Sequence, residues 1–241
     1  MNRIPEGYAD CWTPIESNPE IFTKLAQDIG LSKSLIFEDI WGLDPDSIAL
    51  LSRPVLAIVL VFPTGENYER NVAARNIEER STADDSVIWF KQTIHNACGL
   101  YGLLHAVCNG EAAKQILPGT LLSNLLSSYS VTQPAKRSNL LLSPDLKNKY
   151  LTAAQDGDST VPENAADEVD FHYTCFVKSK GHLYELNGDL SGPVDLGQLN
   201  EDEDVLSAAA LESVRRFMQD NGGASTNIGF SMLALVPKPE N

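Results

Sequence analysis

The residue best placed to do chemistry is Cys98. It lies within the segment 92–107, where a strand is expected to end and Asn96 can cap the helix that follows. Cys98 would then sit in the first helical turn, where free backbone N–H groups and the helix dipole favour a thiolate. Gly99 and Gly102 keep one helix face small enough for a substrate chain or another backbone to approach. A buried, inert core cysteine is the competing interpretation, and on this segment alone the two are evenly matched.

A thiolate that attacks an acyl group needs hydrogen-bond donors for the oxyanion that forms. Gln92 precedes Cys98 by six residues, at the expected strand end. Its side-chain amide and the backbone N–H of Cys98 could form that pair of donors. Taken alone, Gln92 is better explained as a solvated polar residue, so its assignment depends on the other partners of Cys98.

The base must come from one of four histidines, and His172 is the best candidate. His95 is expected to point away from the start of the helix, and His105 lies two turns further along it, out of reach of the thiol. His182 would face Val177 across a hairpin, without a polar group to orient its ring. These three are better explained as packing or surface residues.

The expected hairpin over residues 171–187 gives His172 an orienting partner. If residues 179–180 form the turn, His172 lies directly opposite Asn187, and such cross-strand pairs have Cβ atoms about 5 Å apart. The side-chain oxygen of Asn187 could then accept the imidazole N–H, the third role in a Cys–His–Asn arrangement. A register shift of one residue would remove this pairing.

The sequence also signals the helices and strands that must position these residues. Asn18 and Pro19 start a helix whose apolar stripe ends at Gly30. The run 55–62 is too apolar to alternate and predicts a strand buried on both faces. The expected helices span residues 19–29, 45–51, 65–80, 96–109, 121–151 with a break near 132–134, and 205–219. The expected strands span residues 55–62, 87–90, 171–178, 182–187, 194–196 at a sheet edge, and 228–236.

The order of these elements predicts the fold class. Helices come early and most strands late, which favours an α+β fold over alternating βαβ units. No internal repeat or linker divides the chain, so we expect a single domain. Residues 152–170 lack apolar periodicity and are interpreted as a long mobile loop, and such loops in compact domains are usually functional.

The composition excludes some partners. The chain has 241 residues, 43% of them apolar, with 33 Asp and Glu against 18 Lys and Arg, a formal charge of −15. Nucleic acids and anionic membranes are poor partners for such a surface. The segment 156–204 holds thirteen acids against two lysines, and charge alone favours a solvated surface there over a site that attracts a basic partner.

The cysteines and the N-terminus predict the compartment. Four cysteines without a C-x-x-C pair are too sparse for a disulfide scaffold or a structural zinc site. The sequence shows neither a signal peptide nor an apolar run of the length that a membrane helix needs. We therefore expect a cytoplasmic protein, with a nuclear location as a second option, that needs no metal or cofactor.

Four stretches resemble the ubiquitin C-terminal hydrolases, the papain-like cysteine enzymes that free the carboxyl terminus of ubiquitin. They are Pro14–Glu20, Arg53–Pro63, Gln92–Val107, and His172–Val177 together with Gly181–Gly188. Order and spacing fit nearly the whole chain, and the chain is similar to the short, single-domain fungal members. The resemblance implies a papain-like fold with a central, mostly antiparallel sheet flanked by helices, and a knotted path.

The resemblance also implies a domain plan and roles for residues. It implies one catalytic domain over residues 12–237, flexible termini at 1–11 and 238–241, and a crossover loop at 152–170 that passes over the active site. Cys98 would be the nucleophile, His172 the base and Gln92 the oxyanion donor. Residues expected to contact the substrate are Asn96, Leu100, Asp167 and Asp170.

One residue departs from the family pattern, which usually reads Tyr-Glu-Leu-Asp-Gly where this chain has Asn187 before Gly188. Asparagine can orient an imidazole but cannot stabilise an imidazolium with a full charge. Asp189 is a candidate substitute, although on the expected hairpin it lies diagonal to His172 and would need a bulge.

The expected activity is thiol-dependent hydrolysis at the C-terminal glycine of ubiquitin by a monomer. The closed loop predicts small or unfolded adducts as leaving groups, and the acidic stretch would steer the arginines of ubiquitin's tail. The alternatives are a hydrolase of a close ubiquitin-like modifier and a ubiquitin-binding module with weak or absent catalysis because of Asn187.

Overall fold

The computed structural model describes residues 4–77, 87–159, 162, 164–222 and 229–239. Within these residues, six strands form one sheet in which every neighbouring pair is antiparallel. Across the sheet their order is β2 (Leu35–Asp39), β8 (Ser231–Pro237), β3 (Ala57–Pro63), β5 (Phe171–Ser179), β6 (His182–Leu186) and β7 (Val194–Gln198). A separate parallel pair joins β1 (Asp10–Cys11) to β4 (Ile94–His95).

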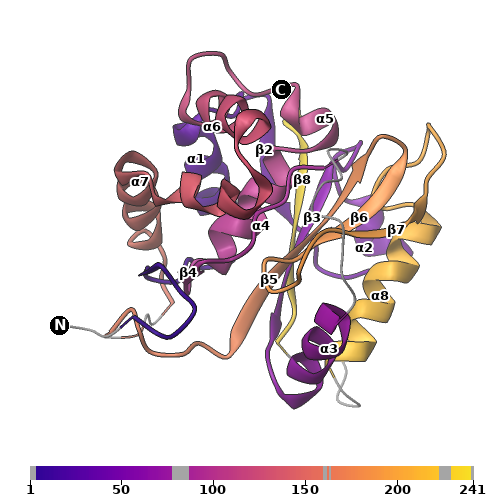
Figure 1. Ribbon diagram of the computed structural model, residues 1–241. Helices are drawn as coiled ribbons and strands as arrows, with labels where there is room; N and C mark the ends of the chain where they lie inside the picture. Colours follow the sequence, from indigo (N-terminus) through magenta and orange to yellow (C-terminus); the bar gives the residue numbers. More distant parts are fainter. Residues whose placement is uncertain (1–3, 78–86, 160–161, 163, 223–228, 240–241) are drawn as a thin grey trace.

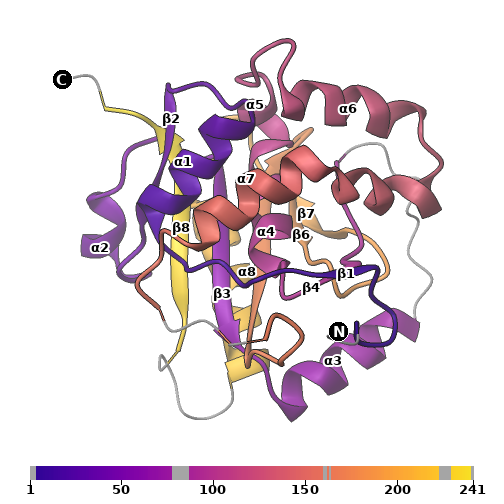
Figure 2. The same ribbon diagram turned by 90° about the vertical axis from the view of Figure 1, so that its left-hand side faces the viewer.

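Helices cover both faces of this sheet (Figure 1). One face carries α1 (Pro19–Ile29), α4 (Cys98–Val107), α5 (Gly110–Ala113), α6 (Leu121–Val131), the 3₁₀ helix η1 (Pro134–Leu142) and α7 (Pro144–Ala154). The other carries α2 (Pro45–Ala49), α3 (Glu66–Ile77) and α8 (Ala208–Gly222). Figure 2 shows α1 and α7 lying over α4, which is thereby enclosed between them and the sheet. No helix in the described part of the chain is long and apolar enough to cross a membrane.

The start of α1 follows the local sequence signals. The side chain of Asn18 accepts hydrogen bonds from the backbone N–H groups of Glu20 and Ile21, with Pro19 in the first turn. Gly30 ends the helix at φ 127°, a left-handed conformation that glycine adopts without strain. The predicted helix over residues 19–29 is confirmed.

Strand β3 is a central strand of the sheet, between β8 and β5. Its side chains alternate between the two cores, Val59 and Val61 toward one and Ile58 and Leu60 toward the other, which explains why the run is apolar without interruption. The buried strand is therefore confirmed. β8 lies between β2 and β3, so the last strand of the sheet along the chain is also one of its inner strands.

The strand expected at residues 87–90 is wrong, because this segment pairs with side chains and not with another strand. The backbone N–H of Ile88 donates to Asn109 Oδ1, that of Trp89 to the hydroxyl of Tyr129, and that of Phe90 to His105 Nε2. Side chains from α4, α6 and the α4–α5 junction thus accept the N–H groups that a neighbouring strand would otherwise bind.

The β5–β6 hairpin forms with a different register from the expected one. Ser179 pairs with His182, so the turn residues are Lys180 and Gly181, with φ values of 47° and 80°. Positive φ at both central residues is typical of a type I′ turn, for which glycine suits the second position. The shift of two positions keeps every side chain on its expected face but removes the direct opposition of His172 and Asn187.

Several element boundaries also differ from the expectation. β2 was not expected, and residues 10–11, expected in a flexible terminus, form β1. The helical region expected over residues 121–151 divides into α6, η1 and α7, and α7 takes residues 152–154 from the expected loop. α8 begins at Ala208 because Asp204 accepts the N–H of Leu206 and holds residues 204–206 in a turn. Residues 78–80 and 228 of the expected elements lie outside the described residues.

Candidate active site

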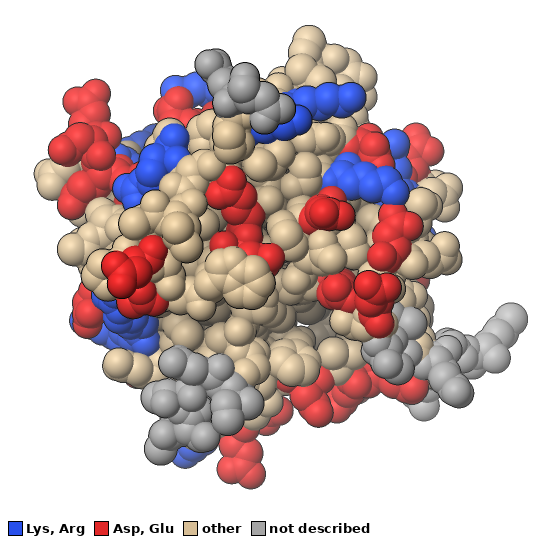
Figure 3. Space-filling model, turned by 180° about the vertical axis from the view of Figure 1, so that it is seen from behind, with Lys and Arg blue, Asp and Glu red and all other residues tan. Residues whose placement is uncertain are grey.

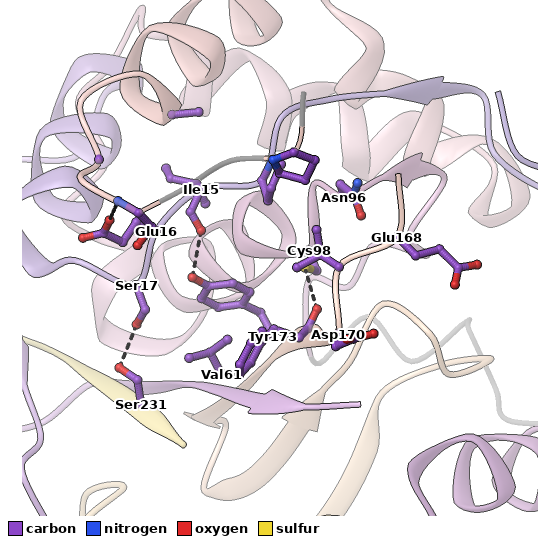
Figure 4. Close-up of a pocket in the computed structure, with 17 residues that line it drawn as sticks. Ile15, Glu16, Ser17, Val61, Asn96, Cys98, Glu168, Asp170, Tyr173 and Ser231 are labelled. Carbon is purple, nitrogen blue, oxygen red and sulfur yellow. Dashed lines mark hydrogen bonds between the residues drawn. The ribbon is translucent and has the colours of Figure 1, made fainter. Parts of the chain in front are cut away.

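Cys98 is the first residue of α4, and its side chain lines a cavity of about 760 Å³. The residue is 7% exposed, and its Sγ lies 4.0 Å from the carbonyl oxygen of Phe171 at the start of β5. Figure 4 shows Cys98 near Asp170, with Tyr173 and Ile15 to the left of them. The predicted position in the first turn of a buried helix is confirmed, and the thiol nevertheless borders open space.

The expected cap of this helix is wrong. Ala97 occupies the N-cap position and makes no side-chain capping bond. Asn96 adopts φ 58°, and its side-chain amide instead donates to the carbonyl oxygens of Ala165 (3.1 Å) and Asp167 (2.6 Å). Asn96 thus ties the 164–170 segment to the start of α4, and the first turn of α4 lacks a side-chain cap beside the thiol.

The two glycines of α4 leave room for neighbouring side chains. A Cβ at Gly99 would lie 2.3 Å from Ile15 Cγ2, and one at Gly102 would lie 3.2 Å from Val59 Cγ1. Glycine lets α4 approach β3 and the segment before α1 closely. This close approach is what brings Cys98 to β5.

His172 lies in β5, opposite Phe62 of β3, with 5% of its surface exposed. Its Nε2 lies 2.9 Å from Asn187 Oδ1, and Cys98 is near enough to raise the pKa of its ring. The contact with Asn187 was predicted, but it arises differently: β6 ends at Leu186, and the chain then turns so that Asn187 reaches back to the ring. The sequence therefore identified the correct partner from an incorrect register.

The hydrogen bonds of Asn187 fix the tautomer of His172. The Nδ2 of Asn187 donates to the hydroxyl of Tyr68 (3.1 Å), and its Oδ1 accepts the backbone N–H of Asp189 (2.9 Å). Oδ1 therefore faces His172 as an acceptor, so Nε2 of the neutral ring must carry its proton. Nδ1 is then the basic nitrogen left for Cys98.

The electrostatics of His172 favour its charged form. Burial lowers the pKa of His172, but the carboxylate of Asp189 and the contact with Cys98 outweigh burial and raise this pKa to about 9. Asp189 Oδ2 lies 3.5 Å from Nε2. An imidazolium beside a thiol is the arrangement that cysteine hydrolases use to activate the sulfur.

Gln92 is joined to the segment that carries Asn187. Its backbone N–H donates to the carbonyl oxygen of Gly188 (2.9 Å), and a Cβ on Gly188 would come within 2.8 Å of Gln92 Cβ. Among the described residues, the buried Oε1 of Gln92 has no hydrogen-bond partner. Gln92 is thus a buried residue in an irregular segment, and not the solvated end of a strand.

The other histidines have separate roles. His105 is buried in α4 and accepts the N–H of Phe90, and burial lowers its pKa to about 3, so it stays neutral. His95 is buried in β4, where its ring meets that of Tyr8 edge to face. His182 does have a polar partner, contrary to expectation, because its Nδ1 lies 2.9 Å from Asp195 Oδ2 at the sheet edge.

The expected substrate-contact residues do not all gather at the cavity. Asn96 and Asp170 line it, whereas Asp167 is exposed outside it and contributes its carbonyl oxygen to Asn96. Leu100 is fully buried in the core and does not line the cavity. Glu16 and Glu168 line the cavity, although neither was selected from the sequence.

The acidic stretch is partly structural. Figure 3 shows acidic side chains in several clusters over one face of the molecule, with fewer basic ones. Glu185, however, is 3% exposed and forms two hydrogen bonds with Arg75, at 3.0 and 2.7 Å. Asp204 pairs with Arg53 at 2.8 Å. These carboxylates are neutralised within the fold and leave those of the cavity as candidates for a basic ligand.

Two residues of the site were missed. Tyr68 of α3 packs its ring against His172, with centroids 5.6 Å apart, and bonds both Asn187 and Asp189. Trp89 donates its indole N–H to the carbonyl oxygen of Asn187. An aromatic residue in the otherwise polar segment 65–80 was the available signal for Tyr68. Within the described part of the chain, no three His, Cys, Asp or Glu side chains cluster as a metal site.

A thiol at the wall of a cavity, with a buried imidazole and its orienting amide behind it, on an α+β fold of this kind, defines a cysteine hydrolase. The chain belongs to the family described as ubiquitin carboxyl-terminal hydrolase, family 1, whose model matches residues 12–219. The expected papain-like fold and thiol-dependent enzyme class are confirmed.

Relatives support this membership over nearly the full length. The chain is 36% identical to ubiquitin carboxyl-terminal hydrolase YUH1 of Saccharomyces cerevisiae over 236 residues, covering 94% of this chain and 96% of the relative. It is 34% identical to isozyme L1 of Monodelphis domestica, covering 92% and 96%. The UCH37 catalytic domain of Trichinella spiralis, solved bound to ubiquitin vinyl methyl ester, shares the fold, with a TM-score of 0.75, 20% identity and coverage of 95% and 96%.

Proposed function

We propose that this protein hydrolyses the bond that follows the C-terminal glycine of ubiquitin, with Cys98 as nucleophile and His172 as general base and acid. The observation that carries the proposal is Cys98 at the wall of the cavity, beside the buried ring of His172, which Asn187 holds. Asn187 orients the ring, and Gln92 with the backbone N–H of Cys98 supplies the oxyanion donors.

The first half of the reaction forms a thioester. The Sγ proton of Cys98 passes to Nδ1 of His172, which gives a thiolate beside an imidazolium, and the thiolate attacks the glycine carbonyl carbon. The negative charge on the carbonyl oxygen is stabilised by Gln92 and by the N–H at the start of α4. When the carbon–nitrogen bond breaks, His172 gives its proton to the leaving amine, and ubiquitin remains bound to Cys98.

The second half releases ubiquitin. His172, again neutral, takes a proton from a water molecule that attacks the thioester carbonyl. The carbon–sulfur bond breaks, and the sulfur recovers the proton through the imidazolium. The raised pKa of His172 suits the acid steps, because the ring holds its proton until the leaving group takes it.

The test compares two buried cysteines of the same helix region. C98A is expected to abolish release of aminomethylcoumarin from ubiquitin and to prevent labelling by ubiquitin vinyl methyl ester. C108A is the matched control, because burial raises the pKa of the Cys108 thiol to about 12 and the residue lies at the far end of α4. A C98A variant that still turns over the substrate would refute the assignment. A folded parent that binds ubiquitin without turnover would indicate a binding module.

The segment between α7 and β5 supports a preference for small or unfolded leaving groups. The backbone N–H of Ser159 donates to Glu16 (2.7 Å), and Asn96 holds the carbonyl oxygens of Ala165 and Asp167. These contacts attach the described parts of the loop on both sides of the cavity. A segment held in this way admits an extended tail more readily than a folded partner.

Hydrolysis of folded diubiquitin relative to a fluorogenic ubiquitin adduct measures this preference. The parent is expected to cleave diubiquitin at least 100-fold more slowly. N96D, which keeps a residue tolerant of positive φ but removes both N–H donors, is expected to reduce this ratio several-fold. Equal rates for the two substrates in the parent protein would exclude the size preference.

The carboxylates of the cavity support recognition of a basic tail. Glu16, Glu168 and Asp170 line it, and ubiquitin carries arginines just before its C-terminal glycines. We expect kcat/KM to fall as salt rises, since exposed charges are screened over about 10 Å at 0.1 M. E168Q/D170N should weaken this dependence, whereas E212Q, at an exposed position of α8, should not. A salt-independent kcat/KM would assign these acids to solvation alone.

The same assays separate ubiquitin from ubiquitin-like modifiers. Adducts of both kinds with the same fluorophore, compared at low substrate concentration, give the ratio of kcat/KM directly. A higher value for a ubiquitin-like adduct would change the substrate and leave the roles of Cys98 and His172 intact.

A further inference from the structure

The orienting residue of His172 carries no charge. Asn187 fixes the ring through its Oδ1, but an amide cannot balance the imidazolium that forms during the reaction. A carboxylate does lie nearby: Asp189 Oδ2 is 3.5 Å from Nε2 of His172. It reaches the ring because the chain leaves the ladder after β6, so no bulge is required.

We propose that Asp189 is a positioning residue that supplies the negative charge missing from Asn187, so that orientation and charge balance come from two different side chains. This inference rests on the proposed function only in taking His172 as the base. The neutral Asn187 sets the tautomer, and Asp189 holds the imidazolium.

The hydrogen bonds around Tyr68 hold the carboxylate in place. The hydroxyl of Tyr68 accepts from Asn187 Nδ2, so its single proton is free for another acceptor. That acceptor is Asp189 Oδ2, at 3.0 Å. The backbone N–H of Asp189 meanwhile donates to Asn187 Oδ1. Amide, phenol and carboxylate are thus joined in one hydrogen-bonded set.

The surrounding charges leave His172 as the partner of this carboxylate. Arg75 is bound to Glu185, and Lys91 donates to the backbone oxygens of Asp189 and Leu190 rather than to a carboxylate. Within the described residues, the ion pair formed by the Asp189 side chain is the one with His172.

Apart from the sulfur of Cys98, the other groups that face the ring supply no negative charge at neutral pH. Cys98 and neutral His105 approach from α4, Tyr68 from α3 and Phe62 from β3. Burial raises the pKa of Tyr68 well above its ordinary value, so the phenol stays protonated. Apart from the Cys98 sulfur itself, Asp189 is the anion that can raise the pKa of His172.

The decisive experiment is an NMR titration of the His172 ring in the free protein, which reads the pKa without substrate. D189N is nearly isosteric and removes the charge, and the His172 pKa is expected to fall by about one to two units. The high-pH limb of kcat/KM should move down by the same amount, with about a 10-fold lower rate at pH 8.5. D195N, which removes the carboxylate beside His182 at the sheet edge, is the matched control and should leave the His172 titration unchanged.

Moving the charge tests the division of roles. N187D/D189N places the carboxylate where the amide was, and the pKa of His172 and the activity are expected to return toward the parent values. N187D alone should give no gain, since two carboxylates would then compete for the one proton of Tyr68 and one of them would take up a proton itself. If D189N does not fold, Y68F frees the same carboxylate and should lower the His172 pKa by a smaller amount.

The outcomes separate this inference from the proposed function. An unchanged His172 titration in D189N overturns the inference even if activity falls, because only packing would then have changed. Failure of N187D to rescue D189N also overturns it. A parent protein with no hydrolysis of ubiquitin adducts refutes the proposed function, while the titration of His172 still decides the role of Asp189.

Discussion

A methyl group added at Gly188 should reduce catalysis by displacing Gln92. The Cβ of an alanine would lie 2.8 Å from Gln92 Cβ and 3.2 Å from Gln92 N. Carbon atoms in contact normally sit about 3.5–4.0 Å apart, so the two segments must separate by at least about 0.7 Å. The obstacle is a Cβ and a backbone nitrogen, not the flexible end of a side chain. A donor displaced by about 1 Å costs on the order of 100-fold in rate.

We therefore expect G188A to lower kcat for ubiquitin–aminomethylcoumarin by about 10- to 100-fold with little change in KM, because an oxyanion donor acts in the transition state. Overpacking should also cost about 1–3 kcal/mol of stability, read by thermal unfolding. G65A is the control, because a Cβ at Gly65 would meet no atom within 4 Å.

A double variant identifies the cause of any loss. If the methyl group acts through Gln92, Q92A/G188A should be no slower than Q92A, since the donor is already absent. Additive losses would show that the methyl group acts elsewhere, for instance on Asn187 next to it. A folded G188A enzyme with kcat within twofold of the parent would refute the placement of Gln92 as a donor.

Three further perturbations follow from the structure. The pKa of His172 is raised to about 9, and the reaction needs the protonated ring for the leaving amine. The value of kcat/KM should therefore fall tenfold per pH unit above about pH 9. A fall that begins near pH 6.5 would contradict this. G99A places a Cβ 2.3 Å from Ile15 Cγ2 and should lower Tm by roughly 3–10 °C in a thermal scan. R75M leaves Glu185 buried and unpaired and should reduce the unfolding free energy by about 3–5 kcal/mol in urea titrations, whereas R75M/E185M should lose less.

Elements with local signals were predictable. The cap, stripe and terminal glycine of α1 lie within a dozen or so neighbouring residues, and the apolar run of β3 is itself the signal. The segment 87–90 shows the opposite case: its composition resembles a strand, but its backbone partners are side chains of three distant residues. β2 was missed because it is short and pairs with β8, almost two hundred residues later in the chain.

The residues of the site likewise divide into those with a local sequence signal and those that depend on distant contacts. Cys98 and His172 were selected from their residue types and the elements expected around them, whereas Gln92 was assigned through the resemblance to the family. The tie from Asn96 to the loop, and the set formed by Tyr68 and Asp189, were not predictable because each depends on contacts between segments far apart in sequence. The predicted hairpin register was wrong because Lys180 adopts a positive φ, which lysine does not favour.

The position of β8 between β2 and β3 has a consequence for biosynthesis. β8 leaves the ribosome after every other strand of the sheet, so until then β2 and β3 each present an unpaired edge. Before β8 is made, β2 cannot join the other four strands of the sheet, and α1 cannot pack on the completed sheet. A nascent chain that stops before residue 231 should be inactive and prone to aggregate through these edges, so the hydrolase can become active only after β8 has been made.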